Sequence, residues 1–354
     1  MKIGDITGLG EPITKLIEVI RQGVGGISKP YLVKKNAEAK AYEIRQIADA
    51  IHDARISLGS ADFQNEELVL VSKDTPDETQ ILLPERAQSR KEYQEQLEQF
   101  NTEQITSNAA EELMQEDTVV SEEKVDPDWI ARFFDMAKNV STEEMQFLWG
   151  KVLAGEVKQP NTFSLRTLEL LRNLSRKEAE IFIKVAHLAI KSSDAKQAFI
   201  LNPRDDKYLK DNHNVSFMDL LLLEELTLIV PHELAYEIRS IRTPNHQAYT
   251  HGDNIVIVKL PDNFTHTIRV RAFTALGKDL LNLVEVPNNT QYIYKFAELL
   301  KLDNTTVKLG TIVKHEGEYI HHSDLREITE EEIRAAQAEA KNSEKQITPV
   351  NNSQ

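Results

Sequence analysis

The stretch from Asp126 to Ser175 constrains the fold of this 354-residue chain more than any other part of the sequence. It holds both tryptophans, and nearly all of its apolar residues recur at the three- and four-residue spacing of a helix face. Such stripes more often form a packed core than a cofactor pocket. We therefore predict a helical core here, continued by the next helix, with these core residues: Trp129, Phe133, Trp149, Leu153, Leu168 and Phe182.

Capping residues predict where the helices of this stretch begin and end. Asp126 precedes a proline, and Ser164 precedes an apolar run, so each is expected to cap a helix N-terminus. The patterns Ser141–Glu144 and Ser175–Glu178 predict capping boxes, in which side chain and backbone bond reciprocally. Gly155 is expected to end a helix in the left-handed conformation. The helix after the second capping box is apolar on most sides and is expected to be the buried one.

Residues 1–60 are expected to form an N-terminal helical arm. A first helix over Pro12–Ile20 has one apolar face but no tryptophan or phenylalanine, and it has fewer basic residues than interfacial helices usually carry, so we favour docking onto protein over lipid. A longer helix from Lys34 to Leu58 has a heptad-like seam, whose alanines permit close helix approach. The seam predicts an internal hairpin or self-association through Ala37, Ala41, Ile44, Ala48 and Ile51.

Changes of pattern divide the rest of the chain, and the predicted fold class is mainly α with a smaller α+β part. After residue 196, the order helix, strand, hairpin and helix predicts a winged-helix-like module. Its hairpin would join Ile255–Leu260 to Thr267–Phe273. The predicted parts after the arm are a variable insertion or loop (61–84), the central helical core (85–195), the C-terminal winged-helix-like module (196–286), a small α/β appendage (287–322), and a polar helix with a disordered tail (323–354).

Composition excludes several classes of function. The formal net charge of −15 disfavours a general nucleic-acid coat, which needs a basic surface. The absence of cysteine removes disulfides, thiolate catalysis and cysteine zinc sites, and it fits a reducing cytosol. The chain starts without the apolar stretch of a signal peptide, and the apolar run Leu220–Leu223 is far shorter than the ~20 residues of a membrane span. We expect a cytoplasmic protein, with peripheral attachment to the inner membrane as the alternative.

Sequence patterns of known catalytic or metal chemistry are missing. The ten histidines show no tight ligand spacing. His321-His322 could bind a metal with a nearby carboxylate, but two exposed loop histidines are the simpler interpretation. The glycine clusters lack the flanking strand and GK[ST] of a phosphate loop. A composite acidic site from Asp126, Asp128, Glu144 and Glu156 is conceivable, yet helix caps explain the first three. We predict no catalytic residue, cofactor or metal.

Several segments resemble an uncharacterised bacterial family, domain-of-unknown-function family 2806. The resemblance is carried by DPDW (Asp126–Trp129), ARFF (Ala131–Phe134), STEEMQFLWGKVLAGEV (Ser141–Val157), Pro160, FSLRTLELLRNLS (Phe163–Ser175) and FTALGKDLLNLV (Phe273–Val284). The layout is more distantly similar to the abortive-infection alpha proteins, with a glycine-rich amphipathic start, a helical region and a proline turn. That similarity implies phage defence by arrest or death of the infected cell.

These features together predict a non-enzymatic bacterial interaction or assembly protein, with an anti-phage role implied by the distant similarity. Its expected partner is itself, as a homo-oligomer, or another protein. One alternative is a peripheral membrane effector that uses residues 9–31, and another is a hydrolase, which no motif supports. A third is a DNA-binding regulator that uses the winged-helix-like module, whose few basic residues are spread among acids: Arg239, Arg242, Lys259, Arg269, Arg271 and Lys278.

Overall fold

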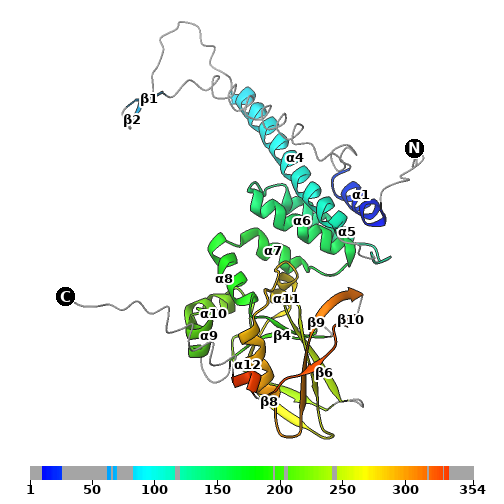
Figure 1. Cartoon of the computed structure of the whole chain (residues 1–354). Helices are drawn as coiled ribbons and strands as arrows, with labels where there is room; N and C mark the ends of the chain where they lie inside the picture. Colours follow the sequence, from blue (N-terminus) through cyan, green and yellow to red (C-terminus); the bar gives the residue numbers. More distant parts are fainter. Residues whose placement is uncertain are drawn as a thin grey trace, which may run out of the picture. The chain divides into compact units, whose positions relative to one another are not determined.

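The computed structural model describes residues 10–25, 62–64, 67–69, 83–115, 120–193, 196–202, 206–240, 245–316, 319–329 and 331–334. The chain divides into two compact units, residues 1–161 and 162–354. The described part of the first unit is mostly helical, and the second is built around a large sheet (Figure 1). The predicted alanine seam, the C-terminal tail and most of the predicted insertion lie outside the described residues.

Four helices make up most of the described part of the first unit. They are α1 (Glu11–Val24), α4 (Leu83–Gln115), α5 (Pro127–Ala137) and α6 (Glu143–Lys158). A short strand pair, β1 (Asp62–Gln64) and β2 (Glu67–Val69), precedes α4. Helix α4 runs alongside α6 (Figure 1). The helix predicted over 12–20 and the two helices predicted between Asp126 and Gly155 are therefore present.

Helix ends in the first unit follow the predicted caps only in part. The Asp126 side chain accepts a hydrogen bond from the Asp128 amide over 2.8 Å and caps α5, as predicted. The predicted capping box at Ser141–Glu144 is wrong, because the cap residue is Thr142 and its side chain makes no capping bond. Gly155 does not end α6, because the helix continues through the fully buried Val157, whose packing outweighs the glycine signal.

The apolar face of α1 is covered by the protein itself. Ile13, Leu16, Val19 and Ile20 are buried, and α1 contacts α4, α5 and α6. The ammonium of Lys15 donates a hydrogen bond of 2.8 Å to the Ser121 carbonyl. Insertion of this face into lipid would therefore first require α1 to leave its neighbours.

The second unit combines helices with strands. Its helices are α7 (Leu165–Asn173), α8 (Arg176–Ala186), α9 (Asp206–His213), α10 (Phe217–Glu225), α11 (Ala275–Leu281) and α12 (Thr290–Leu300). Its strands are β3 (Ile190–Ser192), β4 (Ala198–Leu201), β5 (Leu234–Arg239), β6 (His246–His251), β7 (Asn254–Lys259), β8 (Thr265–Ala272), β9 (Thr306–Glu316), β10 (Tyr319–His322) and β11 (Arg326–Glu327).

Helices α7 and α8 begin where the sequence predicts. Ser164 caps α7 by accepting a hydrogen bond from the Thr167 amide, and Ser175 forms the predicted capping box with Glu178 at the start of α8. The expectation that the helix after Ser175 is buried on most sides is wrong. Helix α8 ends at Ala186 with one buried face, and the remaining apolar residues continue into β3. Short apolar runs suit a buried strand as well as a buried helix, which is why the pattern misled.

The described strands of the second unit form a nine-stranded antiparallel sheet. Their order is β10-β9-β7-β6-β3-β4-β8-β5, with β11 also paired to β9. The predicted fold class is therefore wrong in its C-terminal part, which is a large sheet with helices and no winged-helix-like module among the described residues. The predicted hairpin is absent as well: β7 pairs with β6 and β9, whereas β8 pairs with β4 and β5.

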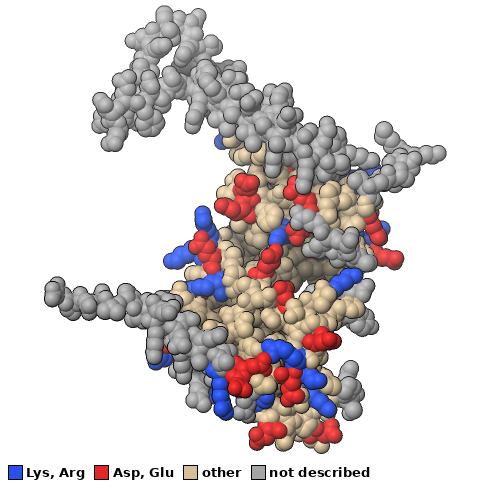
Figure 2. Space-filling view, in the orientation of Figure 1, with Lys and Arg blue, Asp and Glu red and all other residues tan. Residues whose placement is uncertain are grey.

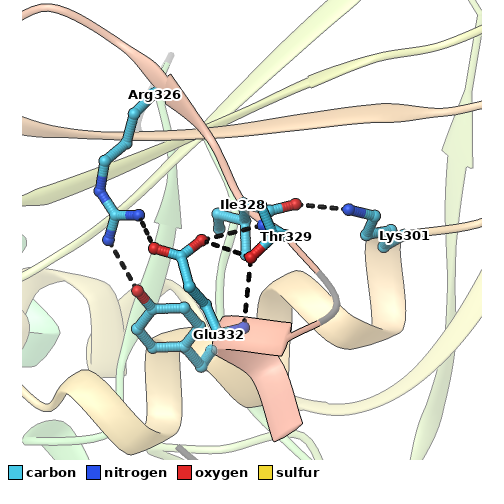
Figure 3. Close-up of polar contacts among 6 residues, drawn as sticks. Lys301, Arg326, Ile328, Thr329 and Glu332 are labelled. Carbon is cyan, nitrogen blue, oxygen red and sulfur yellow. Dashed lines mark hydrogen bonds and ion pairs between the residues drawn. The ribbon is translucent and has the colours of Figure 1, made fainter. Parts of the chain in front are cut away.

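The end of the described chain is held against helix α12 by polar contacts (Figure 3). Arg326 on β11 donates a hydrogen bond of 2.7 Å to the Tyr294 hydroxyl of α12, and it forms an ion pair with Glu332. Thr329 and Glu332 bond reciprocally as a capping box, with amide-to-oxygen distances of 2.9 and 3.2 Å. The Lys301 ammonium donates to the Ile328 carbonyl. These contacts hold β11 and the helical turn after it against α12.

Candidate functional site

The six predicted core residues are buried but do not form one cluster. Trp129, Phe133, Trp149 and Leu153 lie in the first unit, and Leu168 and Phe182 lie in the second. In the first unit the aromatic rings pack in sequence, with Phe133 5.0 Å from Trp129 and 5.3 Å from Trp149 between centroids. None of the six lines the cavities described below. The residues predicted for self-association, Ala37, Ala41, Ile44, Ala48 and Ile51, lie outside the described residues.

His321 and His322 belong to strand β10, so the prediction of a loop there is wrong. Both side chains are exposed, and the Nδ1 atom of His322 lies 2.8 Å from the Ser323 carbonyl. In the part of the chain that the structure describes, no group of three or more histidine, aspartate or glutamate side chains has the arrangement of a metal site.

A cavity of about 650 Å³ lies in the second unit beside the end of strand β6, where the chain turns into β7. Its floor comes from β3 and β6, which supply Lys191 and its cross-strand partner Thr250. Its walls come from the turn between β6 and β7 and from the loop between α11 and α12. The residues that line the cavity are His187, Ala189, Lys191, Thr250, Gly252, Asp253, Val284, Glu285, Val286, Pro287, Asn288 and Ile312. The volume is typical of small-molecule sites.

Lys191 is the cationic side chain of this cavity. Burial lowers the pKa of Lys191, and no carboxylate among the described residues counters that effect. An ammonium removed from water without a compensating anion is destabilising, so a ligand that supplies an anionic oxygen would relieve the cost. The position therefore favours binding of a polar ligand more than a purely structural role for the lysine.

Asn288 fixes the wall opposite the sheet. Its side-chain oxygen accepts hydrogen bonds from the Asp253 amide (2.8 Å) and the Asn254 side chain (3.0 Å), and its nitrogen donates to the Asp253 carboxylate (2.9 Å). Gly252 has a φ of +55° and lies directly against this loop. The glycine is required here, because other residues rarely adopt such a φ and have a side chain where the loop passes.

A cluster of histidine and tyrosine rings packs beneath the opposite face of the sheet. His251 alternates with the cavity-lining Thr250 and Gly252 along the strand, so it points the other way, toward α12. The Tyr292 ring lies between His213 and His251, at centroid distances of 5.1 and 5.2 Å. The Tyr292 hydroxyl accepts a 2.7 Å hydrogen bond from the Leu201 amide. The cluster ties α9, α12 and the sheet together.

Both imidazoles of this cluster are held in the neutral form. Burial lowers the pKa of His213 to about 4, and the neighbouring His251 adds to the effect. Burial also lowers the pKa of His251, although its Nδ1 hydrogen bond to the Ala189 carbonyl, 3.0 Å long, opposes the shift. The Nε2 atom of His251 is buried without a hydrogen-bond partner. The same Ala189 lines the cavity, so this histidine supports the cavity floor from behind.

A second cavity, of about 340 Å³, lies in the first unit between α1, α4 and α5. Its lysine, Lys138, is already paired, lying 3.1 Å from Asp135 and 3.7 Å from Glu98. A hydrogen bond with Asp135 raises the pKa of Lys138, and the charge of Glu98 raises it further. Because Lys138 is already paired within the protein, this cavity is a weaker candidate for a ligand site than the cavity at Lys191.

The basic residues proposed for DNA contact are mostly engaged within the second unit. Arg239 pairs with Glu237, Arg269 with Glu233 and Arg271 with Glu224. The Lys278 ammonium donates to the Lys196 carbonyl, and Arg242 lies outside the described residues. Figure 2 shows one face of the molecule, on which basic and acidic side chains are interspersed and the described residues form no continuous basic patch.

Sequence reasoning missed the Lys191 cavity. The segment around Lys191 was assigned to the end of a helix, and β6, which forms the other half of the floor, was not predicted at all. The one local signal is Gly252-Asp253-Asn254, a combination typical of tight turns between strands. Nothing in the sequence alone places that turn beside Asn288.

Comparison with known proteins gives one family. The model of the family described as "Protein of unknown function (DUF2806)" matches residues 85–297, which spans parts of both units. No curated protein and no solved structure matches. In the described residues no helix is long and apolar enough to cross a membrane.

Proposed function

We propose that this chain, which belongs to the DUF2806 family, is a non-enzymatic interaction protein whose second unit binds a small molecule in the Lys191 cavity. The observation that carries the proposal is the cavity itself, with a half-buried lysine that has no counter-ion among the described residues. The lining combines this charge with apolar side chains and a wall fixed by Asn288, the usual composition of a ligand site.

Binding is tested with the full-length chain and a panel of small-molecule classes: neutral sugars, nucleosides, organic acids, phosphate esters and amino acids. Thermal melting reports binding, because a ligand of the folded state raises the melting temperature. The cavity is filled in the variant Val286→Trp, and Val313→Trp is the matched control, because Val313 is 73% exposed on β9 and does not line the cavity. A shift that survives in the filled variant contradicts the assignment of the cavity as the site.

We further propose that the protein works by assembly with itself or with a protein partner, in the cytoplasm. Two adjacent apolar side chains at the start of α10, Phe217 and Met218, are 57% and 66% exposed, which suits a protein contact. The predicted seam at residues 37–58 supports self-association. Light scattering on the parent and on the double variant Ala41→Glu/Ala48→Glu tests this: the parent should be oligomeric, and the variant smaller, because buried charge is costly.

An anti-phage role is a narrower form of this proposal and rests on the distant similarity to abortive-infection alpha proteins. A pull-down from infected and uninfected cells tests it, and a partner captured only after infection is the expected outcome. The DNA-binding alternative rested on the winged-helix-like module, and the described residues form a large sheet there instead. Most of the basic residues proposed for DNA contact also have partners within the protein. A membrane role through residues 9–31 would need α1 to expose its covered face.

A further inference from the structure

Opposite charges lie on different walls of the Lys191 cavity. Lys191 and Thr250 lie side by side on the floor, where β3 pairs with β6. Asp253 comes from the turn after β6, and Glu285 comes from the loop after α11. The cavity therefore has a cationic floor and an acidic rim.

The two sets of charges do not neutralise each other. Among the described residues no ion pair joins Lys191 to Asp253 or Glu285, and burial lowers the pKa of Lys191. The Asp253 carboxylate accepts a hydrogen bond of 2.9 Å from the neutral side-chain amide of Asn288, which holds it in place. A ligand in the cavity would therefore meet an ammonium at one end and carboxylates at the other.

The charge balance of the lining decides which ligand fits. Two carboxylates and one ammonium repel a doubly charged phosphate ester, and a simple carboxylate would satisfy only the floor. A molecule with a carboxylate at one end and an ammonium at the other can pair with the lysine on the floor and with the carboxylates on the rim. We propose that the cavity binds a zwitterion of the amino acid class, with its carboxylate at Lys191 and its ammonium at Asp253 and Glu285; this assignment rests on the proposed ligand-binding function.

The remaining lining is compatible with this ligand class. Apolar side chains that could contact the ligand's own side chain come from Ala189, Val284, Val286, Pro287 and Ile312. The volume of about 650 Å³ leaves room for a large amino acid or a dipeptide. The Thr250 hydroxyl lies beside Lys191 and can donate a hydrogen bond to the ligand carboxylate.

Calorimetric titration of the full-length chain tests the assignment. The ligands are the twenty amino acids and glycyl dipeptides, followed by the N-acetyl and the amide derivatives of the best binder. The N-acetyl form lacks the ammonium and the amide lacks the carboxylate, so each should bind about tenfold more weakly or worse, as expected for loss of one charged hydrogen-bonding pair. An acetylated or amidated ligand that binds as well as its parent overturns the proposal.

Variants locate the binding. Lys191→Met should fold, since it removes a desolvated charge, and should weaken zwitterion binding about tenfold or more, while Lys191→Arg retains part of the affinity. Lys259→Met, at an exposed lysine on β7, is the control and should bind as the parent does. Glu285→Gln should weaken the zwitterion but leave the N-acetyl form unaffected.

The possible outcomes distinguish failure of this inference from failure of the proposed ligand-binding function. Equal affinity of the parent and Lys191→Met for the zwitterion overturns the inference. Binding of a sugar, nucleoside or phosphate ester instead, lost in Val286→Trp, also overturns the inference but leaves the ligand-binding function standing. If no class of compound shifts the melting temperature or titrates, both the inference and the proposed function fail.

Discussion

A β-carbon on Gly252 would lie 2.5 Å from the side-chain oxygen of Asn288 and 3.0 Å from the Val286 carbonyl. The first of these separations is shorter than any ordinary van der Waals contact. Asn288 cannot move away freely, because the same oxygen accepts hydrogen bonds from Asp253 and Asn254. The turn after β6 and the loop before α12 are therefore fitted to each other through this glycine.

Gly252→Ala should destabilise the second unit by at least about 2 kcal/mol, because it combines an unfavourable positive φ with a steric clash. It should also weaken ligand binding in the cavity. Gly25→Ala is the control, since Gly25 has a φ of +81° with nothing within 4 Å of the added carbon, so only the backbone term of about 1 kcal/mol applies. Denaturant unfolding measures both, and equal costs would contradict the close fit at Gly252.

Acid should weaken the second unit through its buried imidazoles. The folded-state pKa of His213, about 4, lies below the ordinary value of 6.5, so between these pH values the unfolded chain binds a proton that the folded chain does not. The free energy of unfolding should therefore fall as pH drops through this window, by about 3 kcal/mol from His213 alone. The lowered pKa of His251 acts in the same direction.

Denaturant unfolding at a series of pH values between neutral and acid checks this prediction. His213→Gln removes one titrating group and should flatten the dependence, whatever it does to stability at neutral pH. His246→Gln, at an exposed histidine on β6, should leave the slope unchanged. Parallel curves for the parent and His213→Gln would refute the role assigned to the buried imidazole.

Truncation of Trp149 should destabilise the first unit. Trp149 is fully buried against Phe133, so Trp149→Ala should cost roughly 3–5 kcal/mol, the range for large aromatic side chains. Its indole nitrogen is buried without a hydrogen-bond partner, so Trp149→Phe should cost much less, because it also removes an unsatisfied donor. Phe147→Ala on the same helix, 50% exposed, is the control. A Trp149→Ala variant that melts with the parent would mean that this core is wrongly assigned.

The Glu224–Arg271 ion pair should matter far more than exposed pairs of the same chemistry. The two side chains are 18% and 10% exposed, so Glu224→Ala would remove a carboxylate from beside a buried guanidinium, at a cost of about 3 kcal/mol. The pair Glu180–Arg176 is 63% and 85% exposed, and Glu180→Ala should change stability by less than about 0.5 kcal/mol. Chemical denaturation compares the two, and similar losses would contradict the burial argument.

Helix starts were the part of the fold most accessible from sequence. The caps at Asp126, Ser164 and Ser175 reach only two or three residues along the chain, so local order alone specifies them. The predicted end at Gly155 failed because the helix continues through a residue packed in the core. Propensity is a weak signal, and burial of an apolar side chain overrides it.

Strand pairing and the cavity were inaccessible for a related reason. The segments that became β7 and β8 were recognised as strands but do not pair with each other. β7 pairs with the neighbouring β6 and with the distant β9, and β8 pairs with β4 and β5. Lys191 and Thr250 are 59 positions apart in the chain and adjacent on the cavity floor. No local pattern encodes such a pairing, because many registers satisfy the same alternation of apolar and polar residues.

The sequence by itself determined the helices in the described part of the first unit, the capping of α5, α7 and α8, and the family. These depend on short-range hydrogen bonds and on helical periodicity, and both are set by residues that are close together in the sequence. Only the tertiary structure decided that the second unit is built around a large sheet, and that Lys191, Asp253 and Glu285 line one cavity. That arrangement arises when distant strands bury their apolar faces together, and the long-range packing that selects one register has no signature in any single segment.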